Sequence, residues 1–142
     1  MALDVTLGQK AEWTRRIEPE HVDLYREITG DANPLHFDEG FAAGTRFGGL
    51  IVHGGITAGA LNALVAERLP GPGSVFIKQE LEYVGPARVG DTLTATGEVV
   101  WVHESKPVCH LDVTVTARSG GDAEERECLR GRCVVYRAVP GA

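Results

Sequence analysis

The second half of the chain alternates between apolar and polar positions, which is the pattern of strands that bury one face and expose the other. The alternation predicts strands over residues 75–83, 92–103, 109–118 and 127–137. On the first of them, the side chains that we expect on the core side are Val75, Ile77, Gln79, Leu81 and Tyr83. The amide of Gln79 would then need a hydrogen-bond partner there. We expect a turn at Gly120-Gly121-Asp122 between the last two strands.

The first half of the chain begins with an expected strand over residues 9–17 and a helix that starts at Glu18-Pro19-Glu20. Proline suits the first helical position, and acidic residues suit the positive end of the helix dipole. Gly30 is a suitable left-handed C-cap for this helix. Residues 31–49 are rich in turn-forming residues, and Asp38 is a candidate cap for a short helix over residues 39–43.

The apolar pattern predicts one long helix, over residues 56–69. Its apolar stripe consists of Ile56, Ala60, Leu61, Leu64, Val65 and Leu69. The other side carries small residues, namely Gly55, Ala58, Gly59, Asn62 and Ala66. Such a helix can be approached closely on both sides, which indicates a central helix surrounded by other elements.

The element order is strand, helix, irregular loop, long helix and four strands in an antiparallel meander. This order indicates an α+β fold in one domain that spans residues 1–142. A curved antiparallel sheet wrapped around one long helix is the hot-dog arrangement. Its unpaired edge strands commonly pair between subunits, so we expect a homodimer.

Composition narrows the possible functions. The net charge of −6 argues against general nucleic-acid binding. No apolar run is long enough for a membrane span, and the N-terminus lacks the pattern of a signal peptide. The cysteines, Cys109, Cys128 and Cys133, fit reduced thiols of a cytoplasmic protein. His110 follows Cys109 without any metal-ligand spacing, so no metal and no cofactor are expected.

The loop after the first helix contains a carboxylate and an imidazole five positions apart, Asp31 and His36. Asn33 and Pro34 lie between them and break any helix. A second unusual segment, Ile51-Val52-His53-Gly54-Gly55, leads into the long helix. Addition of water to a conjugated thioester needs a base, an acid and a donor to the enolate-like oxygen. Asp31 and His36 can supply the first two roles in either order, and the free N–H groups of the helix start can supply the third.

The segment from Tyr25 to His36 resembles the hydratase 2 motif of the MaoC-like, R-specific enoyl-CoA hydratases. That motif is an aromatic residue followed shortly by Gly-Asp-x-Asn-Pro-aliphatic-His, with a small residue six positions later, which is Ala42 here. The Val-His-Gly segment before the long helix and the Val89-Gly90-Asp91 segment are also similar to this family. The resemblance covers residues from about Leu7 to Tyr136.

The resemblance implies (R)-specific hydration of a trans-2-enoyl-CoA to an (R)-3-hydroxyacyl-CoA in fatty acid metabolism. It implies that Asp31 and His36 are the catalytic pair and that the backbone N–H of Gly54 binds the thioester carbonyl. Supporting positions are Asn33, His53, Gly55 and Asn62. We expect His53 to hydrogen-bond the catalytic loop, and Asn62 either to face the pocket or to bond a strand.

Each residue also has a simpler interpretation. Asp31 could serve only as a turn residue after Gly30, and His36 alone could be an ordinary hydrogen-bonded histidine. Arg46, Lys78, Arg88 and Lys106 are candidate cations for CoA phosphates, although surface charges are the more common explanation. Two other functions remain alternatives: dehydration of (R)-3-hydroxyacyl groups on an acyl carrier protein, and a non-catalytic acyl-CoA-binding subunit.

Overall fold

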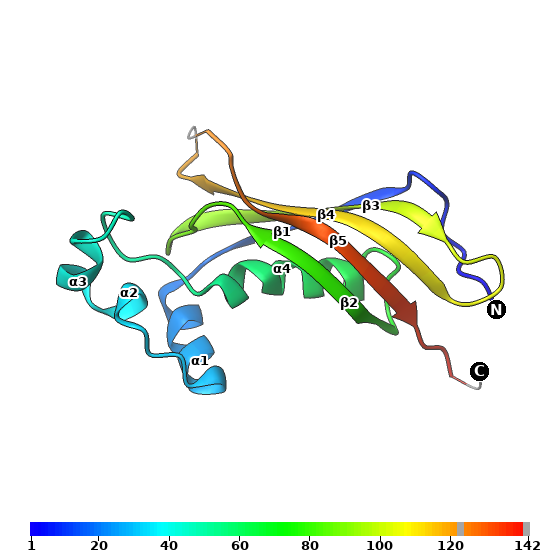
Figure 1. The fold of residues 1–142 in the computed structure, drawn as a ribbon, viewed down its shortest axis with the longest axis horizontal. Coiled ribbons are helices and arrows are strands. Elements are labelled where there is room, and N and C mark those ends of the chain that lie inside the picture. Colours follow the sequence, from blue (N-terminus) through cyan, green and yellow to red (C-terminus); the bar gives the residue numbers. More distant parts are fainter. Residues whose placement is uncertain (122–123, 141–142) are drawn as a thin grey trace.

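A five-stranded antiparallel sheet curves around one long helix in the computed structural model, which describes residues 1–121 and 124–140 (Figure 1). The elements in chain order are β1 (Lys10–Arg16), α1 (Pro19–Thr29), α2 (Pro34–Phe37), α3 (Glu39–Ala43), α4 (Gly54–Glu67), β2 (Ser74–Tyr83), β3 (Asp91–Val102), β4 (Val108–Ser119) and β5 (Arg126–Arg137). This is the predicted α+β hot-dog fold. Within the described ranges, no helix is both long and apolar enough to cross a bilayer.

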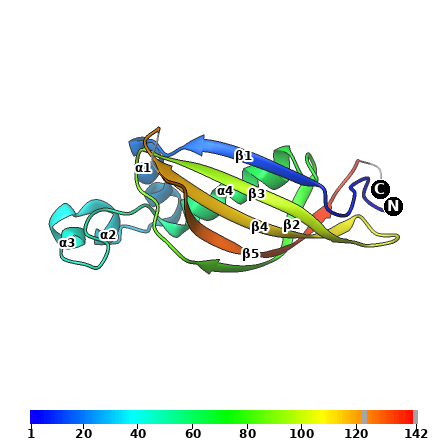
Figure 2. The same cartoon turned by 90° about the horizontal axis from the view of Figure 1, so that it is seen from above.

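The order of strands in the sheet is β1-β3-β4-β5-β2, so β1 and β2 are the two edges (Figure 2). Helix α4 lies along the concave face, while α1, α2 and α3 lie beyond one end of the sheet (Figure 1). The core is formed between α4 and the central strands, where side chains such as Leu61, Leu64, Leu111 and Val115 are fully buried. Burial of this apolar surface is the main stabilising term of the fold.

Helix α4 begins at Gly54, two residues earlier than the apolar pattern predicts. The first turn contains glycines rather than apolar side chains, so the periodicity becomes visible only from Ile56 onward. The earlier start places the free N–H groups of the helix at Gly54 and Gly55. The helix ends at Glu67, and Leu69 is buried although it lies beyond the end.

The two helix caps predicted before α4, Gly30 and Asp38, are confirmed. Gly30 caps α1 in the left-handed conformation with φ 80°, and its N–H donates to the Arg26 carbonyl oxygen. The Asp38 carboxylate accepts a hydrogen bond from the N–H of Phe41 and caps α3. The predicted turn at residues 120–122 has Gly120 at φ 75°, whereas Asp122 lies outside the described residues.

The prediction for the buried face of β2 is wrong in part. The register of β2 against β5 shifts between Phe76 and Lys78. Phe76 therefore packs on the core, and the adjacent Val75 and Ile77 do not. Val75 and Ile77 are therefore 55% and 59% exposed. A bulge places one extra residue in a strand and reverses the alternation of faces beyond it. Gln79 is exposed on this edge strand, so its amide needs no partner in the protein.

A buried carboxylate fastens the connection that precedes β3. Asp91 is 2% exposed and accepts hydrogen bonds from the Arg88 backbone N–H at 2.9 Å, the Ser119 hydroxyl at 2.6 Å and the Arg126 guanidinium at 2.7 Å. A buried charge needs such partners, because desolvation is otherwise expensive. The network holds the start of β3 against the end of β4 and the start of β5.

We expect Asp91→Ala to lower the free energy of unfolding by about 2–3 kcal/mol, since it removes the acceptor of three hydrogen bonds, while the remaining Arg126 guanidinium is 40% exposed and keeps its hydration. Asp112 is the matched control, because it also lies 2.7 Å from an arginine, Arg132, but its side chain is 49% exposed. Asp112→Ala should cost less than about 1 kcal/mol. Urea unfolding measures both values, and equal losses would contradict the structural role of the buried network.

Candidate active site

The loop that carries the candidate catalytic pair is ordered by its own side chains. An Asp31 carboxylate oxygen accepts a hydrogen bond from the Asn33 N–H at 3.1 Å, and the Asn33 side chain accepts one from the Leu35 N–H at 3.0 Å. Asn33 thereby caps α2, and Pro34 occupies its first position, where no N–H is required. This local bonding turns the chain between Asp31 and His36, so the two side chains point to the same region.

The Asp31 carboxylate and the His36 imidazole lie 3.9 Å apart, measured from Oδ2 to Nε2. The Nδ1 atom of His36 lies 2.8 Å from the carbonyl oxygen of Ile51. A carbonyl can only accept, so Nδ1 carries a proton, and Nε2 is the ring atom left to accept a hydrogen bond on the side of Asp31. The separation is too long for a direct hydrogen bond and suits a water molecule that donates to both atoms.

His53 joins the end of this loop to its beginning. Its Nε2 donates to the Asp31 carbonyl oxygen at 2.9 Å, and this is the contact with the catalytic loop expected from the sequence. Its ring also packs against two neighbours, with centroids 3.9 Å from His36 and 4.7 Å from Tyr25. The residue is 1% exposed. A buried neutral ring that bonds one end and packs on both faces fixes the positions of Asp31 and His36.

The start of α4 presents free N–H groups beside the pair. Gly54 is the first helical residue and is exposed, so its N–H has no intrahelical acceptor. A Cβ atom at Gly55 would lie 1.5 Å from the Tyr25 hydroxyl oxygen. Gly55 is therefore needed for Tyr25 to pack against the helix. The positive end of the helix dipole makes this position favourable for developing negative charge.

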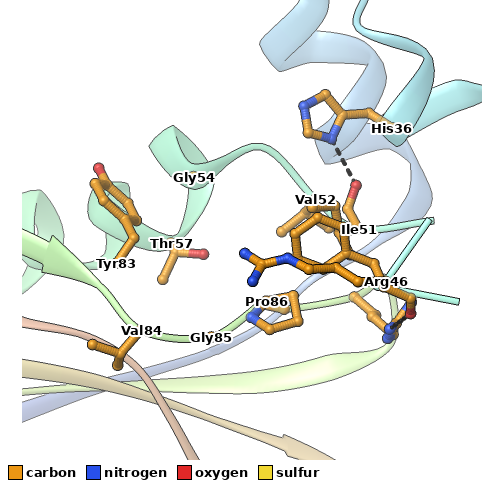
Figure 3. Close-up of a pocket in the computed structure, with 13 residues that line it drawn as sticks. His36, Arg46, Ile51, Val52, Gly54, Thr57, Tyr83, Val84, Gly85 and Pro86 are labelled. Carbon is orange, nitrogen blue, oxygen red and sulfur yellow. Dashed lines mark hydrogen bonds between the residues drawn. The ribbon is translucent and has the colours of Figure 1, made fainter. Parts of the chain in front are cut away.

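A cavity of about 540 Å³ opens next to these groups. His36, Gly54, Thr57, Tyr83 and Arg46 are among its lining residues (Figure 3). The volume lies in the range of small-molecule sites. Asp31 does not line the cavity, but its carboxylate lies 3.9 Å from His36, which does. The single chain thus brings His36 and the helix start to one cavity, with Asp31 beside His36.

The cavity also shows what sequence reasoning missed. Asn62, a predicted supporting residue, is exposed and does not line it. Thr57 and Tyr83 do line it and were not singled out as site residues. The spacing of Thr57 three residues after Gly54 is a usable signal, because residues three apart share one helix face. Tyr83 comes from the end of β2, and no local pattern relates that position to α4.

Asp31, His36 and His53 can offer one ligand atom each within 4.8 Å of one another. The Nε2 of His53 already donates to the Asp31 carbonyl oxygen, and its ring packs against that of His36 with the two planes tilted by 35°. Because that nitrogen is engaged, the arrangement suits acid–base chemistry better than metal ligation. The three free cysteines are all buried, and burial raises the pKa of Cys109 and of Cys133 to about 11, so these two thiols are poor nucleophiles.

Comparison with known proteins shows which family the chain resembles. The model of the MaoC-like domain matches residues 4–120. The chain is 36% identical to an (R)-specific enoyl-CoA hydratase of Aeromonas caviae over 128 residues, which are 90% of this chain and 96% of that protein. It is 44% identical over 96 residues to a 3-hydroxybutyryl-CoA dehydratase of Methylorubrum extorquens, covering 68% of this chain and 61% of that one.

The fold agrees equally well with a solved structure. The (R)-hydratase of A. caviae involved in PHA biosynthesis superposes with a TM-score of 0.84 at 35% identity, covering 95% of this chain and 98% of that chain. These relatives are hydro-lyases that act on acyl-CoA thioesters, as their names state. The chain belongs to the MaoC-like hydratase and dehydratase family.

Proposed function

We propose that this protein hydrates trans-2-enoyl-CoA thioesters to (R)-3-hydroxyacyl-CoA. The observation that carries the proposal is the 3.9 Å gap between Asp31 Oδ2 and His36 Nε2, beside a cavity that the free helix start at Gly54 also lines. The gap has two acceptors and no donor of its own. A water molecule supplies the two donors that such a gap needs.

In the proposed mechanism, the thioester carbonyl accepts a hydrogen bond from the Gly54 N–H, which polarises the conjugated system. The water held by Asp31 and His36 attacks C3 and gives a proton to one of the two side chains. That side chain returns a proton to C2 from the same side, so addition is syn. Acid–base transfer contributes about 10²- to 10⁴-fold, and one oxyanion donor contributes about 10²- to 10³-fold.

Four other residues support these groups in the proposal. Asn33 fixes the turn, His53 holds the Asp31 backbone, and Gly55 admits Tyr25 beside the helix start. Asn62 stays a proposed contributor only if another chain or the substrate reaches it, because it is exposed in the single chain. No cofactor enters the mechanism, since the CoA thioester is itself the substrate.

The same residues would catalyse the reverse reaction on an (R)-3-hydroxyacyl group carried by an acyl carrier protein. Hydration of the CoA ester is favoured because the two comparisons with the A. caviae protein cover nearly the whole of both chains. A non-catalytic binding subunit is disfavoured, since both members of the pair are present and close together. Three free cysteines suit a reducing compartment, so we place the protein in the cytoplasm.

We further propose that the protein is a homodimer that pairs along β2. Strand β2 lies at one edge of the sheet (Figure 2), and its apolar side chains Val75, Ile77 and Tyr83 are exposed. The opposite edge, β1, carries the charged residues Lys10, Glu12 and Arg16, which discourage pairing. An exposed apolar edge is an aggregation risk unless another chain covers it.

We expect Asp31→Asn and His36→Ala each to lower kcat for hydration of crotonyl-CoA by about 10²- to 10⁴-fold, because an amide cannot take up the proton of the water and alanine removes the imidazole altogether. Loss of the conjugated thioester absorbance measures the rate. Asp38→Asn is the matched control for the first variant, since an asparagine still caps α3. His110→Ala on the sheet is the control for the second. Near-normal turnover of a folded Asp31 or His36 variant would disprove the assignment.

We expect Ile77→Lys to convert the dimer into monomers, because a charge replaces an apolar side chain on the pairing edge. Light scattering after size-exclusion chromatography gives the molar mass directly. Leu7→Lys is the control, since Leu7 is also exposed, at 67%, but precedes β1. A wild-type protein that elutes as a monomer at micromolar concentration, or an unchanged dimer in Ile77→Lys, would rule out pairing along β2.

A further inference from the structure

Arg88 lines the cavity, yet its guanidinium group bonds the backbone of the loop that precedes α4. One terminal nitrogen donates to the carbonyl oxygen of Leu50 at 2.8 Å, and the other donates to that of Phe47. These acceptors are 38 and 41 positions away in the sequence. The sequence makes Arg88 a candidate cation for CoA phosphates, whereas the structure uses the planar fork of its guanidinium on the protein itself.

The backbone of Arg88 is fixed to the sheet, so its side chain extends from a rigid base. The Arg88 N–H donates to the buried Asp91 carboxylate at 2.9 Å, and the Arg88 carbonyl oxygen accepts from the Asp91 N–H at 3.0 Å. The same carboxylate is bonded by Ser119 and Arg126. A cation with such a base can hold a loop in place, because the base does not follow when the loop moves.

The guanidinium of Arg88 holds one side of the peptide that joins Leu50 to Ile51. The carbonyl oxygen of this peptide accepts from Arg88, and its N–H donates to the Leu35 carbonyl oxygen in α2 at 3.1 Å. No other group in residues 1–121 or 124–140 donates to the Leu50 oxygen. A peptide unit is planar, so one partner on each side fixes its orientation.

The next peptide, from Ile51 to Val52, bears the acceptor of the catalytic histidine. Its carbonyl oxygen lies 2.8 Å from His36 Nδ1 (Figure 3), and its N–H donates to the Ala87 carbonyl oxygen at 2.8 Å. Two successive peptides thus connect α2 to the cavity wall that contains Ala87 and Arg88. They share the Cα atom of Ile51, so a rotation of the first peptide changes the direction of the second carbonyl. That carbonyl is the acceptor of the proton on Nδ1.

We propose that Arg88 is a positioning residue for His36: it holds the Leu50–Ile51 peptide so that the Ile51 carbonyl keeps the proton on Nδ1. This inference rests on the proposed function, because that function requires Nε2 to accept a hydrogen bond from the reacting water. When the Ile51 carbonyl turns away, the imidazole can carry its proton on Nε2, and an N–H there cannot accept from water. The other partners of the two peptides are backbone carbonyls and His36 itself. Substitution of Arg88 therefore breaks this connection without changing the catalytic pair.

The test begins with Arg88→Met, which keeps a long side chain but removes its donors. We expect kcat for crotonyl-CoA to fall about 10- to 10²-fold, since a misplacement of about 1 Å has an effect of that size. KM should change less than about threefold, because thioester binding does not depend on the His36 proton. Arg88→Lys should give an intermediate kcat, because an ammonium group cannot fork to both carbonyls. Arg137→Met is the matched control and should leave kcat unchanged. Arg137 also donates to a backbone oxygen, that of Pro72 at 3.1 Å, but at the end of β5 remote from α2 (Figure 1).

The ring of His36 gives a second readout, which needs no substrate. In protein labelled with ¹⁵N at histidine, the nitrogen chemical shifts distinguish a protonated ring nitrogen from an unprotonated one. At about pH 8, where an ordinary imidazole carries one proton, we expect wild type and Arg137→Met to carry it on Nδ1 of His36. Arg88→Met should share the proton between Nδ1 and Nε2. The signals that are lost in His36→Ala identify this ring.

Crotonyl-pantetheine, which lacks the CoA phosphates, separates positioning from phosphate binding. An Arg88→Met variant that raises KM for the CoA thioester alone shows that Arg88 binds phosphate, and the inference is then wrong. A His36 proton that stays on Nδ1 in Arg88→Met also overturns it. If Arg88→Met does not fold, Arg88→Lys decides, and wild-type kcat with wild-type ring signals in that variant contradicts the inference. A wild-type enzyme that hydrates neither thioester rejects the hydratase function, and the ring signals alone then confirm or overturn the positioning of His36.

Discussion

The hydrogen bond from His53 to the Asp31 carbonyl oxygen holds the site together. Between these residues the chain leaves the end of α1, forms α2 and α3 and returns to start α4. A second imidazole hydrogen bond, from His36 to the Ile51 carbonyl oxygen, links two residues of the same segment that are 15 positions apart in the sequence. Two imidazole rings thus connect a loop rich in turns to the start of α4. The loop cannot move its carboxylate away from the helix start without breaking one of these bonds.

This constraint explains the packing around the helix start. His53 packs between His36 and Tyr25, and Tyr25 occupies the space that any side chain at residue 55 would fill. The glycine pair at the start of α4 therefore serves two purposes: Gly54 leaves its N–H accessible, and Gly55 admits the tyrosine. A helix start that contains two glycines loses backbone entropy on folding, and the ring packing offsets that cost.

The sequence alone predicted those features that depend on neighbouring residues. Gly30 and Asp38 end and start helices through their own conformations and side chains, and Asp31 and His36 are brought together by a short turn-forming loop. Prediction from the sequence failed where an element distant in the chain determines which side chains are buried. The bulge in β2 reversed the faces of Val75 and Ile77, and only pairing with β5 reveals it. Tyr83 lines the cavity because the end of β2 lies opposite the start of α4, a relation that spacing along the chain does not encode.

The edge strand and the cavity share a boundary. Tyr83 is the last residue of β2, and its ring lies where a Cβ at Gly54 would approach it to 3.0 Å. The next residues, through Arg88, form the wall opposite α4 (Figure 3). A second chain that pairs along β2 would therefore cover the apolar edge and lie beside the mouth of the cavity at the same time. Association and substrate selection would then depend on one strand, so a change at Tyr83 would act on both.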